Sequence, residues 1–146
     1  MTFGKLDDKT YLIRLSRGED VHETIKTFCN EHKIKNALVS ALGSLENPTL
    51  AHYRMDTKKY SEKKLEGVFE LTNLTGNIGI FEDDIILHFH VTIADENMQA
   101  FGGHLVQGTA SATIEMTITV YPTTYVKQFN EEVGLKLWEL TKEFPK

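Results

Sequence analysis

The sequence predicts an α+β domain, in which a largely antiparallel, twisted β-sheet packs against one main helix. Three features support this fold class. Only one clear stretch, just after Asp20, has apolar residues at helical spacing. Much of the remaining chain alternates between apolar and polar residues, which is typical of strands with one buried face. The turns between these segments are short, which favours antiparallel pairing of successive strands.

The first strand and the helix are predicted near the N-terminus. Residues 10–17 alternate as a strand does. Asp20 begins the helix with a glutamate three residues later, which resembles a capping box with Asp in place of Ser or Thr. The helix carries one apolar stripe, formed by Val21, Ile25, Phe28 and Cys29. We expect Cys29 to be a small core residue, and His22 and His32 to face solvent.

Further strands are predicted in the middle of the chain, at residues 37–42, 49–55, 67–74, 78–81 and 85–93. Gly43 closes the first of these, and a polar connection over residues 56–64 follows the second. Thr75, Gly76 and Asn77 have turn chemistry and separate the third from the fourth. The last of them is the longest uninterrupted strand pattern.

Two more extended segments follow. Residues 98–106 are interrupted by Gly102 and Gly103, whereas residues 111–121 alternate strictly. The apolar face of the second segment consists of Ile114, Met116, Ile118 and Val120. The tail over residues 126–146 has two interpretations, because its apolar residues fit either a helical stripe or a short strand, namely Leu135, Leu137, Trp138 and Leu140.

Length and composition predict a single domain over residues 1–146, with its core at about residues 8–130. A chain of 146 residues can bury a core without covalent staples. The single cysteine excludes an internal disulfide framework and a cysteine-based zinc cluster. No apolar run is long enough to span a bilayer, and the first residues lack the layout of a signal peptide. We therefore expect a cytoplasmic protein with no membrane partner.

The charge balance disfavours nucleic acid as a partner of the isolated chain. Sixteen basic residues stand against 21 acidic ones, for a formal net charge of −5, and DNA affinity rests largely on neutralising phosphates. The densest basic pairs are Lys58-Lys59 and Lys63-Lys64, which nearby glutamates dilute. The chain also lacks a phosphate-binding glycine loop, a serine nucleophile elbow and a basic stripe with interleaved aromatic residues.

Three histidines form a candidate metal site. His88 and His90 project from the same face of the strand predicted at residues 85–93, about 6.5–7 Å apart along it. His104 lies on the next extended segment, where the preceding glycines allow close approach or bending of the backbone. Zinc and transition metals accept neutral imidazole, and three ligands leave a position open for water or a small anion. The alternative is a polar strand face, or core histidines satisfied by hydrogen bonds.

Glu115 is the candidate acid–base residue. It lies in the middle of a strand, on a face lined with threonines. There it could accept a hydrogen bond from a ligand imidazole, or act as general base toward bound water. The alternative is a solvated glutamate, or one paired across strands.

Several short motifs, in this order and spacing, resemble the plants-and-prokaryotes-conserved (PPC) domain. They are RGED at residues 17–20, LGS at 42–44, GVFELTNLTGNI at 67–78, LHFHVTIAD at 87–95, GGHLVQG at 102–108 and TIE at 113–115. The resemblance covers about residues 8–130. It implies an α+β fold with a largely antiparallel sheet, assembled as a homotrimer.

The resemblance also bears on function. In plants this domain accompanies AT-hook DNA-binding motifs, and prokaryotic single-domain members are commonly labelled predicted DNA-binding proteins; this chain has no Arg-Gly-Arg-Pro hook. In the prokaryotic branch, the positions of His88, His90 and His104 resemble a metal site, and no established reaction accompanies the family. Our first hypothesis is a trimeric protein that binds a divalent metal, zinc before others, and with it a small ligand or a metal-assisted reaction. The second is a DNA-associated regulatory module that works through assembly or a partner protein.

Overall fold

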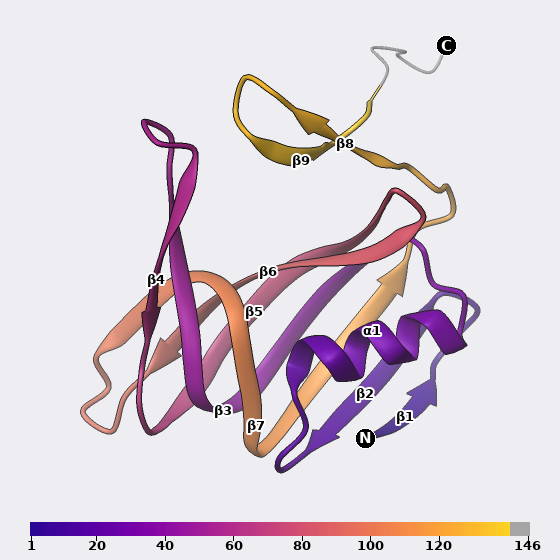
Figure 1. Cartoon of the computed structure of the whole chain (residues 1–146). Helices are drawn as coiled ribbons and strands as arrows, with labels where there is room; N and C mark the ends of the chain where they lie inside the picture. Colours follow the sequence, from indigo (N-terminus) through magenta and orange to yellow (C-terminus); the bar gives the residue numbers. More distant parts are fainter. Residues whose placement is uncertain (141–146) are drawn as a thin grey trace.

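The computed structural model describes residues 1–140, which form a strongly bent β-sheet, one helix and a small C-terminal hairpin (Figure 1). The helix is α1 (Val21–Glu31). The strands are β1 (Thr2–Lys5), β2 (Thr10–Ser16), β3 (Ala37–Arg54), β4 (Lys59–Lys64), β5 (Val68–Phe81), β6 (Asp84–Ala94), β7 (Ala100–Val120), β8 (Lys127–Asn130) and β9 (Leu135–Trp138). The predicted α+β class with a mainly antiparallel sheet is confirmed, although the helix is small. None of the helices in the described part of the chain has the length and apolar character needed to cross a membrane.

The main sheet has seven strands in the order β1-β2-β7-β6-β5-β3-β4, and all of its strand pairs are antiparallel. Strand β3 pairs with both β5 and β7, and β6 also pairs with both. These four strands therefore close a ring of pairings. Strand β7 pairs with different strands along its length. Its first residues pair with β6, and its last residues pair with β2.

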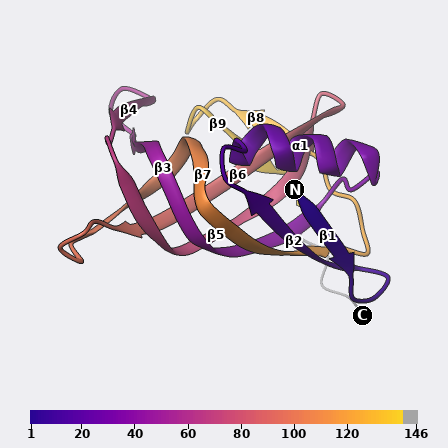
Figure 2. The same cartoon turned by 90° about the horizontal axis from the view of Figure 1, so that it is seen from below.

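Helix α1 covers one side of the sheet (Figure 2). The Asp20 side chain accepts a hydrogen bond from the backbone N–H of Glu23 at 2.9 Å, as the capping pattern predicts. The four residues of the apolar stripe are fully buried, which confirms the predicted core role of Cys29. The prediction that His22 and His32 face solvent is wrong. The Nδ1 atom of His22 is buried, because its ring packs 5.3 Å from that of Phe89 on β6. The ring of His32 lies 4.3 Å from that of Phe28 and 4.8 Å from that of Phe3 on β1.

Several predicted breaks lie inside long strands. Residues 37–54 form one strand, β3, with register shifts near Gly43 and between Glu46 and Leu50. The polar connection after it contains β4. The predicted turn at residues 75–77 is the middle of β5. Gly76 is there for packing, because a Cβ at this position would lie 2.6 Å from Cδ1 of the buried Phe89. Pairing with β6 thus keeps residues 75–77 in an extended strand, despite their local preference for a turn.

The tail forms a hairpin of β8 and β9, so the short-strand interpretation is confirmed for Leu135–Trp138. The rest of the predicted tail, residues 141–146, lies outside the described residues. The hairpin is held against the main sheet by a bridge between Ile80 and Val126. It also contacts the β3–β4 end, where the Tyr53 hydroxyl donates to the carbonyl of Val133. The hairpin therefore covers part of the sheet that includes β5 and β6 (Figure 1).

Leucines are exposed on the sheet face opposite the helix. On β2 and β3, Leu12, Leu38 and Leu42 are 45%, 48% and 58% exposed, whereas the residues beside them in sequence point into the core. No element among residues 1–140 covers this face (Figure 2). The leucines are interspersed with polar residues of β7, such as Glu115 and Thr117. Exposed leucines on an uncovered sheet face are typical of an interface between proteins.

Burial of Cys29 predicts an unreactive thiol. The residue is fully buried on α1, and burial raises the pKa of its thiol to about 12. Because the thiolate is the nucleophile, a chromogenic disulfide reagent at about pH 8 should label the native protein only on the timescale of unfolding. In denaturant it should label one thiol per chain at once. Fast labelling of the native protein would contradict the packing of α1.

Candidate metal centre

The two histidines of β6 are oriented by the apolar residue between them. Phe89 is fully buried, so its neighbours His88 and His90 must project from the opposite face of the strand. In the pairing of β6 with β7, His104 lies directly opposite His90. The tight turn that joins the two strands therefore brings the third histidine to the other two, as the sequence predicts.

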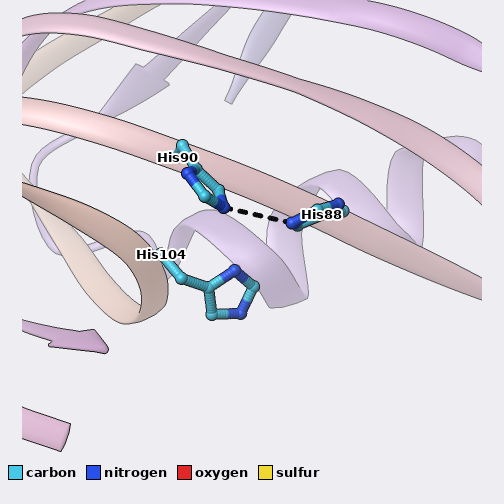
Figure 3. A group of neighbouring side chains, drawn as sticks. All are labelled: His88, His90 and His104. Atoms are coloured by element: carbon cyan, nitrogen blue, oxygen red, sulfur yellow. Dashed lines mark hydrogen bonds between the residues drawn. The ribbon is translucent and has the colours of Figure 1, made fainter. Parts of the chain in front are cut away.

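The three imidazole rings converge (Figure 3). The Nε2 atoms of His88 and His90 lie 3.2 Å apart, and one ring nitrogen from each of the three histidines lies within 4.8 Å of the others. Two nitrogen ligands of a tetrahedral zinc ion are about 3.3 Å apart, given bonds of about 2.0–2.1 Å. The β6 pair thus already has ligand spacing, and His104 supplies a third nitrogen beside it.

One unpaired nitrogen supports this assignment. The Nδ1 atom of His104 is buried and has no hydrogen-bond partner among the described residues. A buried polar atom without a partner costs free energy, unless another group binds it. A metal ion held by the three rings would satisfy it.

The rings have the ionisation state that a metal ligand needs. Burial, the positive charge of Lys127 and the neighbouring His90 lower the pKa of His88 to about 4. Burial is also the main reason why the pKa of His104 falls to about 4, with smaller contributions from the nearby histidines. Both rings are therefore neutral at physiological pH, and neutral imidazole is the form that binds metal.

The backbone beside His104 is tightly packed. A Cβ at Gly103 would lie 2.9 Å from the carbonyl oxygen of Ala51 on β3, so the predicted close approach at the paired glycines is present. The ring of Tyr60, from β4, lies 5.0 Å from the ring of His104. Strands on both sides therefore restrict the position of the third histidine.

A cavity of about 630 Å³ opens beside the histidines. Its lining includes His88 and His104, together with Asn77 on β5 and Lys127 and Trp138 on the hairpin. Sequence reasoning missed these last three residues. The local pattern around Asn77 predicts a turn, although this residue lies in β5 with His88 of β6 as its register partner. No local pattern marks Lys127 or Trp138, because the docking of the hairpin depends on tertiary contacts.

Glu115, the candidate acid–base residue, does not lie beside the three histidines. It is on the predicted threonine-bearing face of β7, in register with Arg14 on β2 and Leu42 on β3. These three residues line a second cavity, of about 850 Å³, on the sheet face opposite the helix. Within one chain, the structure does not bring Glu115 to the three histidines. The group of three on β6 and β7 also excludes His52, which is exposed on β3.

The arrangement can hold one divalent ion with a position free for exchange. Three neutral nitrogen ligands without a thiolate are typical of zinc sites that bind water or substrate at a fourth position. The open cavity gives a small ligand access to that position. The site is thus suited to ligand binding or to metal-assisted chemistry.

Comparison with known proteins identifies similar sequences and folds. The family model of the Plants and Prokaryotes Conserved (PCC) domain, another abbreviation for the PPC domain, matches residues 4–122. A plant- and prokaryote-conserved protein from Pyrococcus horikoshii is similar at 30% identity and a TM-score of 0.85, over 97% of this chain and 96% of that chain. None of the curated proteins matches the chain.

Two further solved structures are similar over almost their whole length. One is described as a metal-containing protein from Archaeoglobus fulgidus, with 28% identity and a TM-score of 0.83, over 94% of this chain and 98% of that chain. The other is described as a candidate DNA-binding protein from Ralstonia eutropha, with 26% identity and a TM-score of 0.87, over 95% of this chain and 96% of that chain.

Proposed function

The chain belongs to the Plants and Prokaryotes Conserved domain family, and within that family we propose that it binds one divalent metal ion through His88, His90 and His104. The observation that carries the proposal is the convergence of three ring nitrogens within 4.8 Å. Zinc readily accepts three neutral imidazoles and keeps a fourth position open for water or another ligand. The similar metal-containing protein from Archaeoglobus fulgidus supports the proposal.

In this proposal the bound metal ion holds a small ligand, and it could also assist a reaction of that ligand. A bound zinc ion would polarise a carbonyl group or lower the pKa of a bound water molecule. The protein chain itself positions the metal ligands and shapes the access to the metal. Strands β6 and β7 fix the three rings, and the cavity under the β8–β9 hairpin admits the ligand and limits water around it.

Metal content tests this proposal directly. Protein purified without an affinity tag should contain about one zinc ion per chain by elemental analysis. Substitution of any one of the three, as in His88→Ala, His90→Ala or His104→Ala, should lower the content to well under half, because two imidazoles hold zinc weakly. The control is His52→Ala, an exposed histidine outside the cluster, which should keep the wild-type content.

The proposal fails if the wild-type protein takes up no divalent metal after incubation with excess zinc and removal of the free ion. It also fails if His52→Ala lowers the metal content as much as His104→Ala does. Circular dichroism of each variant separates the loss of a ligand from the loss of the fold.

We also propose that the chain assembles as a homotrimer. The family resemblance is the main support. The exposed leucines of the sheet face opposite the helix support it independently, because Leu12, Leu38 and Leu42 are about half exposed and no described element covers them. A second copy of the chain is an occupant of matching chemistry, since the face also carries both Arg14 and Glu115 for polar contacts at an interface.

Light scattering should give three times the chain mass of 16.6 kDa at micromolar concentration. Leu42→Glu should shift the protein to smaller species, because it places a charge in the proposed interface. The matched control is Met98→Glu, which adds the same charge at an 86% exposed position in the β6–β7 turn and should leave the mass unchanged. A wild-type protein of monomer mass would contradict the assembly.

The alternative function, DNA binding, is favoured by the description of the similar Ralstonia eutropha protein. The formal charge of −5 per chain argues against it, since a trimer would repel duplex DNA at long range. We expect no micromolar binding of labelled duplex at about 150 mM salt. Salt-sensitive binding that is abolished by substitution of Lys58, Lys59, Lys63 and Lys64, but not by His88→Ala, would support the DNA-associated alternative instead.

A further inference from the structure

The cavity beside the histidines differs in charge from the rest of the molecule. The chain has a net charge of −5, yet among residues 1–140 no aspartate or glutamate lines this cavity, whereas Lys127 and Lys136 do. The charge of a divalent ion at the histidines would add to that of the lysines. An anion is therefore the complementary ligand, and a cation would be repelled.

Lys127 places a buried positive charge in the wall of the cavity. It is only 5% exposed, and its Nζ atom donates a hydrogen bond to Oδ1 of Asn77 at 2.7 Å. The same atom lies 4.7 Å from the centre of the Trp138 ring. No carboxylate among residues 1–140 forms an ion pair with it. A buried ammonium group held only by neutral partners is costly, and an anion would offset that cost.

The position of Lys127 is built into the fold. Its stem lies on the backbone of Gly79 in β5, where a Cβ would be 2.9 Å from Cε of Lys127 and 3.0 Å from Cη2 of Trp138. Asn77, two residues earlier, pairs in register with His88. The ammonium group therefore lies next to the proposed metal centre, close enough for its charge to depress the pKa of His88.

The hairpin also supplies an apolar wall. Phe129, Leu137 and Trp138 line the cavity from β8 and β9, and Leu87 and Tyr60 line it from the main sheet. The cavity volume of about 630 Å³ is in the range of small-molecule sites. The hairpin follows residue 122, where the match to the family model ends. The hairpin side of the wall and the buried lysine therefore lie beyond the residues that the family model matches.

We propose that this cavity binds a small organic carboxylate with an aromatic or other apolar body. Lys127 and Asn77 hold the carboxylate end near the histidines, and the hairpin encloses the body. The inference rests on the proposed metal site for the full affinity. The lysine contribution is separate from it, because an ammonium group with one hydrogen bond to Asn77 has two further donors for the anion.

Trp138 provides the readout, since it is the only tryptophan in the chain and lines the cavity. Its fluorescence is followed while zinc-loaded protein is titrated with phenylacetate, and separately with phenylacetamide, its neutral analogue of the same shape. We expect phenylacetate to bind about tenfold more tightly than the amide, the difference that a charge-assisted hydrogen bond supplies. Equal affinities, or no phenylacetate binding up to about 10 mM, would overturn the proposal.

Variants locate the interaction. Lys127→Met keeps the stem and removes the charge, and should weaken phenylacetate binding about tenfold while leaving phenylacetamide unchanged. Lys127→Arg should retain most of the preference for the acid. Lys64→Met, which removes an exposed lysine on β4, is the matched control and should have no effect. Unchanged phenylacetate affinity in Lys127→Met would overturn the proposal.

The same titration on metal-free protein separates this inference from the proposed function. If the chain binds no zinc but still prefers the acid through Lys127, the metal site is wrong and the anion site stands. If zinc binds at the histidines and no preference for the acid is found with or without it, the metal site stands and the anion site is wrong.

Discussion

The register between β6 and the start of β7 determines the geometry on which the candidate site depends. Burial of Phe89 turns His88 and His90 to the same side, and the pairing of His90 with His104 adds the third ring. A slip of one residue would move each histidine to the opposite face. The register is specified because the apolar residues of β6, among them Phe89 and Ile93, lie in the hydrophobic core.

The site combines residues that the family model matches with a hairpin that follows them. The three histidines lie within the matched residues 4–122, and the hairpin that walls the cavity lies beyond them. The ionisation of the two parts is coupled, because the buried charge of Lys127 helps to keep His88 neutral. A positive, partly apolar cavity in an acidic chain favours a small anion, and the overall charge disfavours a polyanion such as DNA.

The sequence predicted those features that depend on local pattern. The cap at Asp20, the helix stripe and the alternation of β6 follow from periodicity and side-chain chemistry, and so does the pairing of the histidines. Long strands were missed where residues typical of turns serve packing, as Gly76 does against Phe89. Glu115 and Lys127 could not be placed, because their surroundings are set by strands distant in sequence. The alternation of β7 predicted which face of the strand carries Glu115. It could not predict which cavity that face lines.

The central claim is that three imidazoles hold one metal ion with an open position. X-ray absorption at the zinc edge of the purified protein tests it most directly. We expect three imidazole nitrogens at about 2.0–2.1 Å and one or two further light atoms, with a changed edge after phenylacetate is added. A spectrum without the outer-shell scattering of imidazole, or with a sulfur ligand at about 2.3 Å, would contradict the account.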